Sequence, residues 1–206
     1  VDKPDAIQSN ILVGQTVAPG TAPNHLELET MNDVLGGTFT SRINMNLRED
    51  KHWSYGARSS LPDALGERPW LLSAPVQTNR TVEAMREIQR EIAEFLGPRP
   101  ATGDEIARIR NRDVRALSGQ FETNSTVSGA IAQMVTFGRP DDYVRTLKTR
   151  IEAQTDEGVR AAARESLDPS RMTWVVIGDL KTIEQPIRDL RLGEVKVLDA
   201  DGKVVR

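Results

Sequence analysis

Two histidines are the first residues to consider, because imidazole is a common zinc ligand and the usual general base near neutral pH. The chain has only His25 and His52, whereas a catalytic zinc site of the inverted H-x-x-E-H type needs two histidines one helical turn apart. His25 and Glu29 share a predicted helix face, but a glutamate-rich first turn is also what the helix dipole favours. His52 lies in a predicted turn, where an exposed residue is a simpler interpretation than a pH-sensitive group near a peptide. The sequence therefore predicts no metal site in this chain.

Arg48 and Tyr55 are the second pair of candidates. A guanidinium and a phenol in a water-poor cavity can stabilise the negative charge that develops on a carbonyl oxygen during hydrolysis. From residue types alone, a simpler explanation is available. Arg48 would pair with Glu49 or Asp50 on the surface, and Tyr55 would pack beside Trp53. The choice between the two depends on the elements that position these side chains.

Those elements lie in the segment 35–61. Gly36 and Gly37 follow an apolar periodic run, where a helix end needs a residue that tolerates left-handed dihedrals. A second helix is predicted to start at Thr38 or Ser41, with its core stripe formed at i, i+4 and i+8. From residue 53 the period changes to two, which predicts a strand over 53–59. The stripe of the second helix consists of Phe39, Ile43 and Leu47.

The same segment carries the strongest resemblance in the sequence. Its pattern L-G-G-x-F-x-S-R-[IL]-x-x-x-L-R-E, followed by Y-G-A, resembles the C-terminal half-domain of the insulinase, pitrilysin and mitochondrial processing peptidase family of zinc metallopeptidases. The arginine-rich composition is typical of a bacterial member. Similar stretches flank the motif, and the resemblance covers the chain to about Leu180. These flanking stretches are Val1–Ile11, Tyr143 after a Phe-Gly-Arg-Pro step, and Trp174–Asp179.

The resemblance implies a role for Arg48 and Tyr55. In the family, the matching arginine and tyrosine reach across a closed chamber toward the zinc site of the N-terminal half, where they contact the substrate backbone and the tetrahedral intermediate. The resemblance thus implies a catalytically incomplete half of a zinc-dependent endopeptidase. Its implied partners are a zinc-binding half-domain, in the same chain or a separate subunit, and a peptide substrate. Zinc would be bound by that partner half and not by this one.

The composition excludes several kinds of site and partner. Of the 206 residues, 38% are hydrophobic and 28% are charged, with a net charge of −3 and no cysteine. Thiolate sites and disulfides are therefore excluded, and a weakly acidic chain with interspersed basic residues has no field that attracts nucleic acid. No apolar run approaches the roughly 18 to 20 residues that span a bilayer. We expect no nucleic-acid or membrane partner.

The order of predicted elements indicates the fold class. Strands that pair antiparallel flank a long helical block, which predicts an α+β fold with helices on one face of a mostly antiparallel sheet. Asn24 with Glu27, and Thr102 with Glu105, are the predicted helix-capping pairs. Strands are predicted over 11–17, 70–77 and 171–177, helices over 81–96, 102–117, 123–137, 141–153, 155–166 and 180–190, and a hairpin over 194–205.

Two functional hypotheses from different classes follow. In the first, residues 1–206 form one α+β domain excised from a longer two-domain peptidase. In the second, the chain is a non-enzymatic scaffold or assembly subunit of the same fold, with Arg48 and Tyr55 retained as vestiges. A periplasmic location is suggested by the resemblance alone.

Overall fold

The computed structural model describes all 206 residues and contains one sheet of four strands. Their order is β2-β3-β1-β4, and every neighbouring pair is antiparallel. The strands are β1 (Gln8–Val17), β2 (Arg58–Ser60), β3 (Arg68–Gln77) and β4 (Thr173–Ile177). The predicted α+β class is confirmed.

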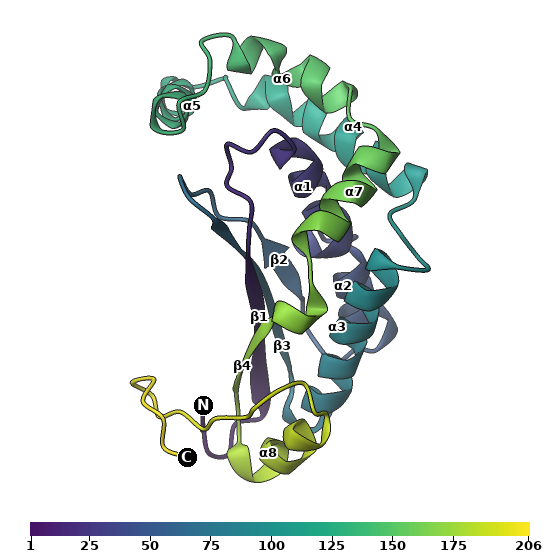
Figure 1. Ribbon diagram of the computed structural model, residues 1–206, viewed down its shortest axis with the longest axis vertical. Helices are drawn as coiled ribbons and strands as arrows, with labels where there is room; N and C mark the ends of the chain where they lie inside the picture. The colour runs from purple at the N-terminus through teal and green to yellow at the C-terminus, as the bar shows by residue number, and fades with distance from the viewer.

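Alternation along the strands creates two unlike faces, because successive side chains of a strand point to opposite sides. Ile11, Val13, Trp70 and Leu72 are buried on one face, which we call the covered face. Figure 1 shows α1 (His25–Asn32), α2 (Arg42–Asn44), α3 (Thr81–Leu96) and α7 (Asp156–Ser166) gathered on that side. No helix lies over the middle of the other face, which we call the uncovered face.

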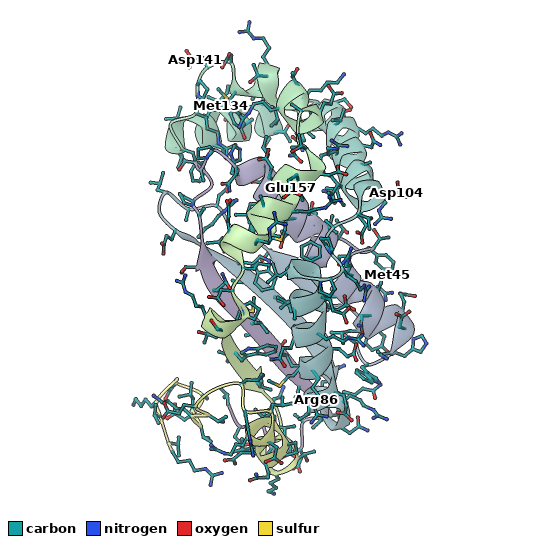
Figure 2. All side chains as sticks on the ribbon, turned by 45° about the vertical axis from the view of Figure 1, so that its right-hand side comes forward. Met45, Arg86, Asp104, Met134, Asp141 and Glu157 are labelled. Carbon is teal, nitrogen blue, oxygen red and sulfur yellow. The ribbon has the colours of Figure 1, made fainter.

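The remaining helices extend the fold at its ends. α4 (Gly103–Gly119) and α6 (Tyr143–Glu152) lie beyond the sheet, and α8 (Leu180–Asp189) lies at its other end. α5 (Asn124–Thr136) has no buried residue and extends toward the uncovered side, as Met134 in Figure 2 helps to locate. The C-terminal segment extends toward the same side at the opposite end. No helix is both long enough and apolar enough to cross a membrane.

Local signals explain the helix boundaries that sequence predicts well. Thr81–Leu96 is a helix of the predicted length, and its buried stripe includes Met85, Ile88 and Ile92. Thr102 and Glu105 form the predicted capping box. The predicted cap at Asn24 is wrong: its side chain makes no capping bond, and the backbone N–H of His25 is bonded to the Ala22 carbonyl instead.

The two glycines after α1 have a different role from the one predicted. The helix continues through them as a π-helical turn, η1 (Asp33–Gly37), and neither adopts a positive φ. A Cβ on Gly36 would lie 2.4 Å from the Ser59 Oγ on β2. Gly36 is therefore needed for the close approach of η1 to the sheet edge and not for a left-handed turn.

Candidate functional site

Arg48 lies near the end of a second π-helical turn, η2 (Met45–Asp50), which continues directly from α2. Met45, its first residue, is labelled in Figure 2. The Arg48 guanidinium lies 4.6 Å from the centre of the Phe39 ring, and its Nε lies 3.2 Å from the Glu49 Oε1. Its side chain is 39% exposed. An arginine over an aromatic face keeps its charge in contact with solvent while its orientation is restricted.

Phe39 differs from the prediction, which placed it in the core stripe of the second helix. It is 55% exposed, whereas Ile43 and Leu47 of the same stripe are buried. The reason is the helix start: α2 begins at Arg42 after an extended Ser41, so Phe39 precedes the helix and does not share its periodicity. The exposed ring serves as the platform on which Arg48 rests.

A tight reversal at His52 follows η2. His52 is exposed, with a φ of 57°, and its Nδ1 lies 3.0 Å from the Arg48 carbonyl oxygen. The next backbone N–H, that of Trp53, donates to the Leu47 carbonyl at 3.0 Å. Histidine tolerates this left-handed conformation less well than glycine or asparagine, so the local bonds hold it. The prediction of an exposed turn residue is confirmed.

Tyr55 projects into solvent with 87% of its surface exposed. Ser54 forms a bridge with Val76, and the Ser54 Oγ donates to the Pro75 carbonyl at 2.6 Å while accepting from the Gly56 N–H at 3.0 Å. Val76 points to the covered face, so alternation directs Tyr55 away from it. The strand predicted over 53–59 is therefore shorter, because the Ser54 side chain takes over backbone bonding and β2 starts only at Arg58.

A buried amide connects the two candidate residues. Asn44 is 3% exposed; its Nδ2 donates to the Phe39 carbonyl at 2.6 Å, and its Oδ1 accepts from the Ala57 N–H at 3.0 Å. One side chain thus fixes both the loop that carries the Arg48 platform and the segment that carries Tyr55. Sequence analysis missed Asn44, and the only signal for it was a short polar residue among core positions.

His25 and Glu29, which share the predicted helix face considered for a metal, both make contacts inside the fold. His25 is buried, with its Nδ1 2.8 Å from the Ala22 carbonyl and its Nε2 3.0 Å from the Tyr143 hydroxyl. Burial lowers the pKa of His25, which favours the neutral ring that links α1 to α6. Glu29 lies 3.5 Å from the buried Arg68 guanidinium. No group of three or more histidine and carboxylate side chains is placed to hold a metal ion.

Two cavities of the chain lie away from Arg48 and Tyr55. A polar recess of about 410 Å³ is lined by residues of α1, α4 and α6, Glu29 among them, and by Arg139 of the loop before α6. An apolar cavity of about 330 Å³ lies between β4, α8 and the C-terminal segment. Arg48 and Tyr55 line neither. Arg48 on η2 and Tyr55 before β2 are hydrogen-bond donors that reach solvent, and they would act on a group that another surface holds against them.

Known proteins resemble this chain in sequence and in fold. Residues 1–112 match the family described as peptidase M16 inactive domain. No curated protein sequence matches the chain significantly. Among solved structures, the peptidase M16 inactive domain from Pseudomonas fluorescens is 21% identical, with a TM-score of 0.80 over 87% of this chain and 42% of that one. A protease from Helicobacter pylori is 18% identical, with a TM-score of 0.77 over 86% and 42%.

A third matched structure is a chain of a multi-subunit complex and is not described as a protease. A chain of complex III2 from Candida albicans is 13% identical, with a TM-score of 0.73 over 93% of this chain and 48% of that one. At these identities the structural likeness shows the fold alone. The chain spans less than half the length of the three matched chains.

Proposed function

The chain belongs to the peptidase M16 inactive domain family, and from that premise we propose that it supplies half of the substrate chamber of a zinc-dependent endopeptidase. Arg48 and Tyr55 would contact the bound peptide and the tetrahedral intermediate. A zinc-bearing half, in the same polypeptide or in a separate subunit, would complete the enzyme. The observation that carries the proposal is that the partly exposed Arg48 and the exposed Tyr55 are held within the family motif by Phe39 and Asn44.

The residues of this chain do not fit a catalytic zinc site. One of its two histidines is bonded inside the fold, and the other is isolated in the η2 reversal. Zinc therefore belongs, in this proposal, to the partner half. Arg48 and Tyr55 would contribute hydrogen-bond donors.

The chemistry proposed for the pair is electrostatic. Attack on a peptide carbonyl converts its oxygen to an oxyanion, and donors that are already oriented stabilise that charge without reorganising during the reaction. Phe39 limits the movement of the guanidinium, and the Asn44 amide holds the segment after Tyr55. When the partner half closes over the pair and excludes water, each hydrogen bond to the oxyanion becomes stronger.

The test uses this chain combined with its zinc-bearing half. Arg48→Ala and Tyr55→Phe should each lower turnover about 10- to 1000-fold, because each removes one oxyanion donor. Zinc content, measured by metal analysis, should stay unchanged. Tyr143→Phe and Arg86→Ala are matched controls, since Tyr143 is bonded to His25 and Arg86 lies on α3, as labelled in Figure 2. Normal turnover in both Arg48 and Tyr55 variants would refute the assignment.

The second candidate function is a non-enzymatic scaffold or assembly subunit. The likeness to a chain of complex III2 from Candida albicans over 93% of this chain favours it. The two functions differ in what the rest of the protein must contain. An H-x-x-E-H sequence in the parent gene or a neighbouring gene would support the peptidase, and its absence from both would support the scaffold.

A further inference from the structure

The uncovered face of the sheet has a single charged residue. Arg58 on β2 pairs with Ser73 on β3, which pairs with Leu12 on β1, which in turn pairs with Val175 on β4. These four side chains form one row across the face. The other strand residues with this orientation are apolar, proline, glycine or uncharged polar residues. Arg58 therefore supplies the only formal charge among the strand residues of this face.

The Arg58 side chain is exposed and makes no hydrogen bond, ion pair or aromatic contact within the chain. The other arginine of the sheet shows the contrast: Arg68 on β3 is buried on the covered side and paired with Asp63 at 2.9 Å. The other members of the row are Ser73, Leu12 and Val175, none of which carries a carboxylate, and the Ser73 hydroxyl donates to the Asn10 Oδ1 at 3.3 Å. The Arg58 guanidinium is left with five donors and no protein acceptor.

The location of Arg58 connects it with the proposed site. It lies three residues after Tyr55, and strand alternation directs it to the uncovered face, because its neighbours Ala57 and Ser59 are both buried on the covered side. A peptide held at Tyr55 would therefore run close to Arg58. A guanidinium cannot lose its charge, and moving it out of water without a partner is costly. A carboxylate on the peptide would satisfy it with two parallel hydrogen bonds.

We infer that Arg58 is a specificity-determining residue, which selects peptide substrates that carry an aspartate or glutamate near the cleaved bond. This inference rests on the proposed function, because it needs a peptide in the chamber and a partner half that limits the water there. It goes further by naming the class of substrate. It also assigns Arg58 a role separate from that of Arg48, which would act on the backbone carbonyl and not on a side chain.

The experiment uses the chain with its zinc-bearing half and a set of fluorogenic peptides. The peptides are identical except for one residue, which is Glu, Gln or Lys at each position in turn. At one position near the cleaved bond, the wild type should have a kcat/KM at least about 10-fold higher for Glu than for Gln, as expected for a charge-assisted hydrogen bond. Arg58→Gln should abolish that preference, and Arg58→Glu should favour Lys. Arg86→Gln, an equal charge change on α3, should leave it intact.

Three results would overturn the inference. If Arg58→Gln keeps both the turnover and the glutamate preference, the inference fails and the proposed function stands. If Arg58→Gln weakens assembly of the two halves without changing the preference, Arg58 pairs with the partner half and not with substrate. If the wild-type assembly cleaves no peptide of the set, the proposed function fails first, before any Arg58 variant is compared.

Discussion

On the covered face of the sheet Ile11, Trp70 and Leu72 are fully buried under the helices, whereas on the uncovered face Leu71 is 45% exposed and Arg58 is open to solvent. Both faces come from the same strands, so alternation sorts the side chains between them, and the helices bury one of the two faces. The covered face can be altered only at the expense of packing, because protein interiors are close-packed. The uncovered face has no such constraint, and its residues can be selected for what they contact outside the chain.

The comparison separates two kinds of residue at the proposed site. Tyr55 is exposed and Arg48 is partly exposed, and neither belongs to the buried core. Phe39 and Asn44 hold them in place, and Asn44 belongs to the buried side. Substitutions on the covered side should therefore change stability first, and substitutions at the exposed pair should change activity alone.

The largest stability effect should come from two adjacent leucines on β3. Leu72→Ala should lower the free energy of unfolding by about 3 kcal/mol, since it leaves a cavity in the core. Leu71→Ala removes the same atoms from the uncovered face, and we expect a loss below about 0.5 kcal/mol. Denaturant unfolding of both variants measures the contrast. Equal losses would mean that the uncovered face is packed against something in the isolated chain.

Some of this arrangement could be predicted from the sequence, because it depends on local signals. Period, caps and glycine stops locate α3, the Thr102 capping box and the strands that make the sheet. Phe39, Asn44 and Gly36 were misread or missed for a common reason. Their roles come from contacts with Arg48, Ala57 and Ser59, and no periodicity in one segment reports a contact with another.

A second prediction tests whether the buried Asn44 sets the positions of Arg48 and Tyr55. Asn44→Ala should lower the free energy of unfolding by about 2 kcal/mol, because it leaves the Ala57 N–H and the Phe39 carbonyl without their partner. It should also lower turnover in the assembled enzyme. Asn46→Ala is the matched control: Asn46 is an equally buried amide that donates to Glu87 at 2.8 Å and to Glu91 at 2.7 Å. Its loss should reduce stability and leave turnover unchanged.

If both asparagine variants reduce turnover equally, general loosening of η2 would explain the effect. If neither does, the exposed pair is positioned without Asn44. Either result would contradict the view that one buried amide sets the geometry of the site. Turnover and unfolding should be measured on the same preparations, so that the two effects can be compared directly.

The third prediction concerns Gly36, where η1 comes close to β2 at the sheet edge. Gly36→Ala should destabilise the fold by about 1.5 kcal/mol, because the new methyl group would displace Ser59 from its position on β2. Gly66→Ala is a matched control in the loop before β3, where an added Cβ meets no atom within 4 Å. It should be neutral or slightly stabilising. Thermal unfolding distinguishes the two, and equal stability of both variants would show that η1 can move away from β2.

The smallest expected effect on stability concerns the ion pair between Arg42 and Glu105. Arg42 joins α2 to Glu105 of α4, with Nε–Oε1 and Nη2–Oε2 distances of 2.8 and 2.6 Å. Burial alone would raise the pKa of Glu105, but the hydrogen bonds from Arg42 and Thr102 outweigh it and lower the pKa from 4.5 to about 2. The folded state therefore binds fewer protons than the unfolded state below pH 4.5, so the contribution is complete above that pH and is lost as the pH falls toward 2.

Glu105→Gln should accordingly cost about 1 kcal/mol at pH 7, and the difference from wild type should shrink between pH 4.5 and 2. Denaturant unfolding at several pH values measures it. Glu157→Gln breaks a surface ion pair with Arg164, in which Glu157 is 69% exposed, and should change stability little at any pH. A Glu105→Gln difference that does not vary with pH would mean that the Arg42 contact stabilises the helix junction by packing and not by charge.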